Sequence, residues 1–321
     1  MTYNLYLGAD LLPVLSAPDL DAVKTAVNQV WAKVQATDFP ARAKEMADQI
    51  EKKNPDLIGL QEAVLWGIQS PGDFPPGANT PATDVAFDFV NILLDELTLR
   101  GLNYAVVATS TGFDVELPSS TGDDIRLTDR EVILARTDLP PSEFLLWNAD
   151  AGNFITNLDV TVAGLPVTIL RGWASVDVFL RGNLFRFVTT HLEVYSEFVQ
   201  VTQANELVAG PGFTALPLVF AGDFNSNADG SGTATHGILI AAGFVDAWDL
   251  AGSGAGFTCC QDEDLLNLPS ALSRRIDLVL FYGAVAVKNA QVVGKKRGNR
   301  TPSGLWPSDH GGVVAKFRIP D

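Results

Sequence analysis

Several apolar stretches of this chain carry acidic, amide or histidine residues at one end only. Stretches that end this way are "LIGLQE", "FRFVTTH" and "LVFAGDFN", which supply Glu62, His191, Asp223 and Asn225. Two other stretches, "IDLVLF" and "SDHGGVVAKF", begin this way and supply Asp277, Asp309 and His310. If these groups meet at one place, the two kinds of strand run in opposite directions, which predicts mixed sheets. A simple dinucleotide-binding fold is excluded, because it needs a glycine-rich turn after its first strand.

Helical spacing of apolar residues occurs between these strands. It predicts helices over residues 19–36, 40–53, 84–100, 197–209 and 233–243. Hydrophobic residues make up 47% of the 321 positions, which is enough for a large core. Because neither a linker nor a repeat of fixed period divides the chain, we expect one domain over residues 1–321.

Asp223 and Asn225 follow the buried-looking run Leu218–Phe220. In an extended chain, residues two apart project to the same face. We therefore expect the carboxylate and the carboxamide to point at one place from a continuing strand.

The polar residues at these strand ends are hard ligands and proton carriers. Four of them are the carboxylates Glu62, Asp223, Asp277 and Asp309. Oxygen-rich sets of this kind suit Mg²⁺, with Mn²⁺ or Ca²⁺ as alternatives, rather than zinc. A histidine beside an aspartate supplies an oriented acid, base or charge stabiliser near neutral pH. Together these groups are the parts needed for metal-assisted displacement at phosphorus.

The chain is strongly acidic. It has 22 Lys and Arg residues against 38 Asp and Glu residues, a net charge of −16. Such a surface repels polyanions at long range, whereas a tight duplex binder draws its affinity from a basic face. The composition therefore argues against binding of long duplex DNA.

The only two cysteines, Cys259 and Cys260, are adjacent in sequence. This excludes a disulfide framework and leaves too few thiols for zinc spacing. Because a bridge between neighbouring cysteines is strained, we expect two thiols packed in a turn or in the core.

Taken in order, the motifs resemble the endonuclease/exonuclease/phosphatase superfamily, which includes pancreatic deoxyribonuclease and bacterial sphingomyelinases. The motifs are "TYN", "IGLQE", "THLE", "GDFN", "RRID" and "SDH", and they span residues 2–318 approximately. "NLYLGADL", "DREVILAR" and "FTCCQDEDLLN" further resemble bacterial members. The resemblance implies a four-layer α/β sandwich, in which two packed mixed β-sheets are flanked by helices and the site lies between the tops of the sheets.

The resemblance also implies roles for the residues that match these motifs. Glu62, with Asn4 and Asp309, would hold the essential Mg²⁺. Asp223 would orient or deprotonate the attacking water, and Asn225 would steady the phosphoryl oxygens.

Further roles implied by the resemblance concern the histidines. His310, paired with Asp277, would act as general base or stabilise the charge of the pentacovalent state. His191 would contact phosphate or assist the leaving oxygen. Arg130 lies where some nucleases place a phosphate-contacting side chain, and a surface ion pair is the alternative for it. Tyr6 stands where some relatives have an acidic residue, so a second metal from that strand is not implied.

These features predict a divalent-metal-dependent phosphodiesterase of the nuclease or sphingomyelinase type. One alternative is a phosphomonoesterase acting on a sugar or inositol phosphate. Another is a catalytically inactive binding module, which predicts the loss of at least one motif residue, and none is lost. A serine hydrolase is disfavoured because the chain has no Gly-x-Ser-x-Gly elbow.

The expected partner is a phosphate-ester substrate: a nucleotide, a short nucleic acid or a phospholipid headgroup. No apolar run is long enough to span a membrane, and no protein partner is indicated. Localisation is not determined by the sequence, and the acidic composition and abrupt start favour an exported or extracellular protein.

Overall fold

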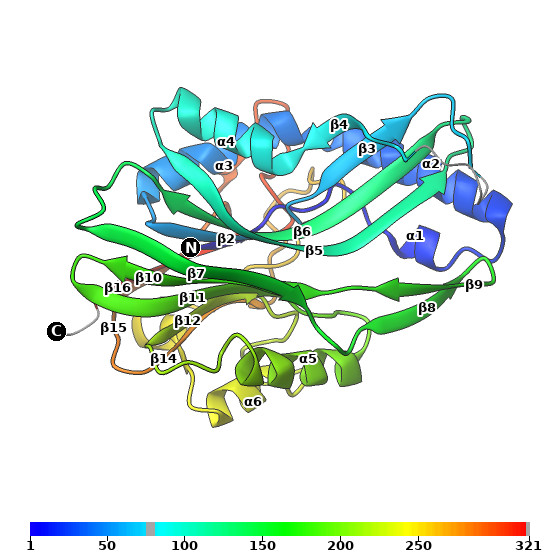
Figure 1. The fold of residues 1–321 in the computed structure, drawn as a ribbon. Helices are drawn as coiled ribbons and strands as arrows, with labels where there is room; N and C mark the ends of the chain where they lie inside the picture. The colour runs from blue at the N-terminus through cyan, green and yellow to red at the C-terminus, as the bar shows by residue number, and fades with distance from the viewer. Residues whose placement is uncertain (75–80, 319–321) are drawn as a thin grey trace.

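Two mixed β-sheets lie face to face, and helices cover the outer face of each (Figure 1). The computed structural model describes residues 1–74 and 81–318. Helices α2, α3 and α4 lie over the first sheet, and α5 and α6 lie over the second (Figure 1). This arrangement confirms the predicted four-layer α/β sandwich.

The first sheet has the strand order β15-β16-β1-β2-β6-β3-β4, with β5 paired to β6. Its strands are β1 (Thr2–Asn4), β2 (Leu57–Gln61), β3 (Leu65–Gln69), β4 (Asp84–Asp88), β5 (Tyr104–Pro118), β6 (Asp124–Arg136), β15 (Ala286–Val293) and β16 (Gly312–Arg318). Only the pairing of β1 with β2 is parallel.

The second sheet has the order β13-β14-β12-β11-β10-β7. Its strands are β7 (Phe144–Asn153), β10 (Gly172–Leu180), β11 (Asn183–His191), β12 (Leu218–Asp223), β13 (Val245–Asp246) and β14 (Asp277–Tyr282). Here only β11 and β12 run parallel, so the predicted mixture of directions is confirmed in both sheets. Strands β8 (Leu158–Val162) and β9 (Leu165–Ile169) form a separate two-stranded ribbon.

The helices include the five that apolar periodicity predicts, together with two short helices and a 3₁₀ turn that were not predicted. They are α1 (Leu12–Leu15), α2 (Leu20–Ala36), α3 (Phe39–Lys53), α4 (Phe89–Leu99), α5 (Glu197–Ala209), α6 (Thr235–Ala241), α7 (Ala247–Ala251) and the 3₁₀ turn η1 (Arg297–Asn299). The prediction of one helix over residues 84–100 was wrong at its start, because residues 84–88 pair with β3 as a strand. Asp88 accepts the Val90 N–H and so begins the helix there. None of the helices among the described residues has the length and apolar character needed to cross a membrane.

The two sheets approach each other closely beneath the site. A Cβ on Gly59 of β2 would lie 2.4 Å from Thr189 Oγ1 and 3.0 Å from the Ala221 carbonyl oxygen. The Gln61 amide donates to Thr189 Oγ1 across the same interface at 2.8 Å. Only a residue without a side chain fits at Gly59, and this contact brings the ends of β2, β11 and β12 together.

Candidate active site

Three neighbouring strands of the second sheet present a row of ionisable residues at one edge. His191 of β11 pairs with Asp223 of β12 in parallel register, and Asp223 pairs with Asp277 of β14 in antiparallel register. All three side chains are buried. The row exists because β11 and β12 end where β14 begins, as the directions of the polar strand ends predicted.

The first sheet brings a second set of residues to the same place. Asn4 ends β1 and Glu62 directly follows β2, while Asp309 and His310 directly precede β16. The Asn4 amide nitrogen donates to Glu62 Oε1 at 3.0 Å and to Asp223 Oδ2 at 3.1 Å. Asn4 therefore links the carboxylates of the two sheets.

A cavity of about 650 Å³ opens over these residues. The predicted site residues that line it are Glu62, His191, Asp223, Asn225, Asp309 and His310. Part of its wall is apolar and includes Leu11, Leu15, Phe113 and Ile169. The cavity thus joins a polar cluster to a surface suited to an organic group.

Asn225 lines the cavity, but it lies in a turn and not in the strand that was predicted to carry it. Strand β12 ends at Asp223, and Asn225 has a left-handed backbone with φ of 49°. Its own N–H donates to Asp223 Oδ1 at 2.9 Å, closing a tight turn. The expectation that both side chains share one strand face was wrong, because this turn replaces the strand.

His310 is held by Asp277. Its Nδ1 lies 2.8 Å from Asp277 Oδ2 and 3.7 Å from Asp223 Oδ2. Burial lowers the pKa of His310, but the charges of Asp277, Asp309 and Asp223 outweigh it and raise the pKa well above its usual value. The geometry therefore favours an imidazolium at this position.

His191 has the opposite electrostatic environment. Its Nδ1 lies 3.1 Å from a terminal nitrogen of Arg171. Burial, followed by the charges of Arg171 and His310, lowers the pKa of His191 well below its usual value. Its other ring nitrogen, Nε2, lies 3.1 Å from the amide nitrogen of Asn225 and 3.7 Å from Asp223 Oδ2, so Arg171 and Asn225 hold the ring from both sides.

Behind His191 lies a second buried acidic group, formed by Asp129 and Glu131 of β6. Burial raises the pKa of Asp129 to about 7 and that of Glu131 well above its usual value. Arg171 lies beside this group, 3.5 Å from Asp129 Oδ2 and 3.8 Å from Glu193 Oε2. Arg171 was missed in the sequence, although it directly follows the apolar stretch "LPVTIL" of residues 165–170 and so carried the same kind of signal as His191.

Asp223 lies where the two sets of residues meet. Burial, and after it the charge of Asp277, raises the pKa of Asp223 to about 6. A carboxyl with this pKa is ionised at neutral pH and remains basic enough to accept a proton.

Glu62 and Asp309 form the part of the site that suits a divalent cation. Burial raises the pKa of Asp309 to about 7; the charge of His310 opposes this rise and that of Glu62 adds to it. Repulsion between two half-buried carboxylates is relieved by a cation, and carboxylate oxygens are what Mg²⁺ prefers. Asn4 is placed differently, because its oxygen accepts the Tyr6 N–H at 2.9 Å and its nitrogen faces Glu62.

Arg130 does not belong to the cluster in the described part of the chain. Its guanidinium donates to the carbonyl oxygens of Ala63 and Val64 and pairs with Asp88 at 2.6 Å. It is absent from the cavity lining. This placement corresponds to the ion-pair alternative. The Arg130 guanidinium also holds the segment that follows Glu62 in position.

Arg42 of α3 joins two loops that lie next to the cavity. Its buried guanidinium donates to the carbonyl oxygens of Thr37, Leu5 and Tyr6 at 2.7–3.0 Å, and to that of Pro307 at 2.9 Å. The loop after Asn4 is thereby tied to the loop before Asp309. The sequence signal for this role was a charged residue on the otherwise apolar face of a helix.

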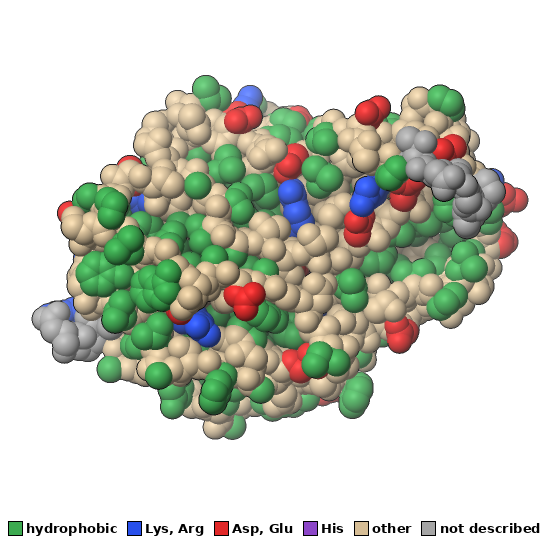
Figure 2. All heavy atoms as spheres, in the orientation of Figure 1, with side chains coloured by type: hydrophobic (Ala, Val, Ile, Leu, Met, Phe, Trp, Pro, Cys, Tyr) green, Lys and Arg blue, Asp and Glu red, His purple; other side chains and the backbone are tan. Residues whose placement is uncertain are grey.

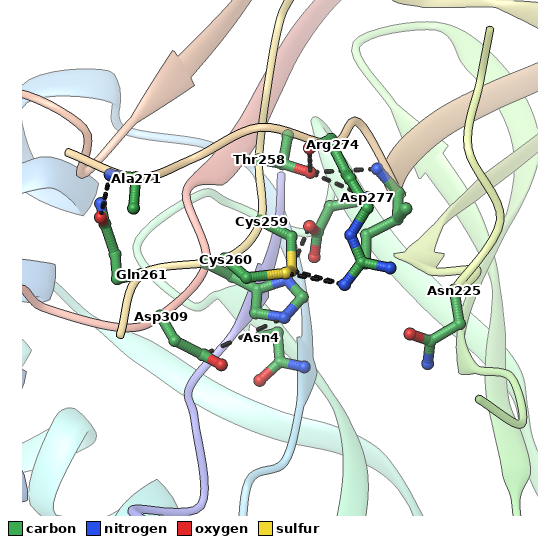
Figure 3. The surroundings of a disulfide bond; sticks show 12 residues. Asn4, Asn225, Thr258, Cys259, Cys260, Gln261, Ala271, Arg274, Asp277 and Asp309 are labelled. Carbon is green, nitrogen blue, oxygen red and sulfur yellow. Dashed lines mark hydrogen bonds and ion pairs between the residues drawn. A yellow bond between two sulfur atoms is a disulfide. The ribbon is translucent and has the colours of Figure 1, made fainter. Parts of the chain in front are cut away.

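Cys259 and Cys260 form a vicinal disulfide that lines the cavity (Figure 3). The prediction of two packed thiols was therefore wrong. Cys259 pairs by its backbone with Arg274 on one side and with His310 on the other. The bridge was not predicted because it depends on the local backbone of this segment, which spacing alone does not reveal.

The fold and this cluster define a protein of the phosphate-ester hydrolase class. Residues 1–310 match the family model described as "Endonuclease/Exonuclease/phosphatase family", and the chain belongs to that family. Hydrolysis of phosphate esters, generally with a divalent metal, is the activity of the family. No curated protein matches the chain in sequence.

Solved structures resemble the chain at low sequence identity. An endonuclease/exonuclease/phosphatase from Bacteroides vulgatus is 15% identical and has a TM-score of 0.60, covering 99% of this chain and 97% of its own. A mannosyl-6-phosphatase from Bacteroides thetaiotaomicron is 16% identical with a TM-score of 0.56, over 99% and 98% of the two chains. TDP2 from D. rerio, complexed with a single-stranded DNA product, is 17% identical with a TM-score of 0.55, over 87% and 92%.

Proposed function

We propose that this protein is a divalent-metal-dependent phosphodiesterase in which water attacks phosphorus in line. The observation that supports it most is the meeting of His191 and Asp223 with Glu62 and His310 from the other sheet in one cavity, with Asp277 behind His310. Each group has a partner that fixes its position or protonation state, which is what acid–base chemistry requires.

The carboxylate of Asp223 accepts the proton of the attacking water as the new phosphorus–oxygen bond forms. The bond from phosphorus to the ester oxygen breaks on the opposite side, and the departing oxygen takes a proton from solvent. The imidazolium of His310 stabilises the negative charge that develops on the phosphoryl group, and Asp277 stabilises that imidazolium. The ring of His191, held by Arg171 and Asn225, lines the cavity beside Asp223 and contacts the phosphoryl group. A cation held by Glu62 and Asp309 would polarise the phosphate and neutralise its charge.

The apolar wall of the cavity favours a diester over a monoester. A diester carries a second organic group, and Leu11, Leu15 and Phe113 offer that group a surface beside the polar cluster. Long duplex DNA is disfavoured by the net charge of −16. On the face shown in Figure 2, basic side chains lie singly rather than in a broad patch.

A substrate panel tests this proposal. We expect purified protein with Mg²⁺ or Mn²⁺ to hydrolyse bis-p-nitrophenyl phosphate faster than p-nitrophenyl phosphate, and EDTA to abolish both activities. The panel also contains single-stranded DNA, sphingomyelin and mannose 6-phosphate, the last because one structural relative is named a mannosyl-6-phosphatase. Faster hydrolysis of the monoesters would support the alternative, a phosphomonoesterase. Full activity in EDTA would refute metal dependence.

A further inference from the structure

The cavity is acidic, and its few cations are therefore informative. Six of its lining residues are carboxylates, namely Asp10, Glu62, Asp129, Asp223, Glu263 and Asp309. The lining contains two arginines, Arg171 and Arg274. Arg171 is held among His191, Asp129 and Glu193, so its charge is already compensated.

Arg274 has no such compensation. It is exposed, and among residues 1–74 and 81–318 it has no carboxylate within ion-pair distance. Its guanidinium instead contacts the disulfide, 2.9 Å from Cys260 Sγ and 3.6 Å from Cys259 Sγ (Figure 3). A cation in an acidic cavity without an acidic partner is free to bind an anionic ligand.

The backbone around Arg274 is fixed to the catalytic segments. Arg274 and Cys259 exchange two backbone hydrogen bonds, of 2.9 and 3.0 Å. On its other side Cys259 pairs with His310, and three residues after Arg274 the Asp277 N–H donates to Thr258 Oγ1 at 3.1 Å. The backbone of Arg274 is thus anchored close to the segments that carry His310 and Asp277, and the disulfide holds its guanidinium.

We propose that Arg274 binds the anionic phosphate of the substrate, with the vicinal disulfide as the surface that holds its guanidinium in place. This inference rests on the proposed function. A guanidinium presents a planar fork of donors that matches phosphate oxygens, and a single such charge-assisted contact contributes substantially to binding. It gives the site the phosphate-contacting arginine that Arg130, outside the cavity, does not supply.

Kinetics of two Arg274 variants test the assignment. We expect Arg274→Gln to raise KM for bis-p-nitrophenyl phosphate, and the inhibition constant for inorganic phosphate, by about tenfold or more, with kcat changed less than about threefold. Arg274→Lys, which keeps the charge but not the fork, should give intermediate values. The matched control is Arg297→Gln, which removes an exposed arginine outside the cavity lining and should leave both constants unchanged. Equal constants for Arg274→Gln and Arg297→Gln would overturn the proposal.

A labelling experiment separates this inference from the proposed function. Phenylglyoxal modifies accessible arginines, and mass spectrometry reports the modification at Arg274 without any need for activity. We expect inorganic phosphate to slow modification of Arg274 but not of Arg297. If wild-type protein hydrolyses no ester, the proposed function fails, and protection of Arg274 still supports the anion site. Absence of protection overturns the Arg274 assignment, whatever the activity.

Discussion

Replacing His310 by alanine is expected to lower kcat for phosphate-ester hydrolysis by at least about a hundredfold, the usual scale for losing a group that stabilises charge in the transition state. The reason is its position, with Nδ1 2.8 Å from Asp277 Oδ2 and the ring held as an imidazolium by three carboxylates. Asp277→Asn should also lower kcat, because it removes the charge that stabilises the imidazolium of His310. Steady-state kinetics with bis-p-nitrophenyl phosphate measure both variants.

The matched control for His310→Ala is His236→Ala. His236 is also buried, but it lies in α6 and outside the cavity lining. We expect it to retain kcat within about threefold once folding is verified by circular dichroism. A loss below tenfold in His310→Ala would remove this histidine from the mechanism.

Arg42→Leu is expected to destabilise the protein by more than about 3 kcal/mol. The substitution leaves four buried backbone carbonyl oxygens without their donor, and each unsatisfied group costs about 1–3 kcal/mol. The loops that carry Asn4 and Asp309 should separate as well, so activity should fall even where the variant remains folded. Urea unfolding followed by circular dichroism measures the change in free energy of unfolding.

Arg318→Leu is the control for Arg42→Leu, because Arg318 is an exposed arginine at the end of β16. We expect its free energy of unfolding to stay within about 0.5 kcal/mol of wild type, as for most surface substitutions. If the two variants unfold at the same urea concentration, the buried guanidinium does not hold these loops.

The directions of the strands were predictable from residues at their ends. His191, Asp223 and Asp277 form one row because β11 and β12 finish at the edge where β14 starts. Apolar periodicity likewise located α2, since Val23, Val27, Val30 and Val34 lie on one face. The expected single domain over residues 1–321 stays a prediction.

Residues outside regular elements could not be placed from the sequence. Asn225 enters the cavity through a left-handed turn, and the disulfide depends on the backbone of an irregular segment. Arg171 reaches His191 because β10 and β11 pair antiparallel, and strand β10 was not among the predicted ones. Arg42 joins two loops whose proximity exists only once the first sheet has formed.

We propose that Glu62 and Asp309, on one side of the cavity, hold a single divalent cation beside the row of the second sheet. Titration of Mn²⁺ followed by electron paramagnetic resonance tests it directly. We predict one tightly bound Mn²⁺ per chain in the wild type, and at least about tenfold weaker binding in Glu62→Gln. Arg297→Gln should bind as the wild type does. Mn²⁺ affinity unchanged by Glu62→Gln would show that Glu62 does not bind the cation.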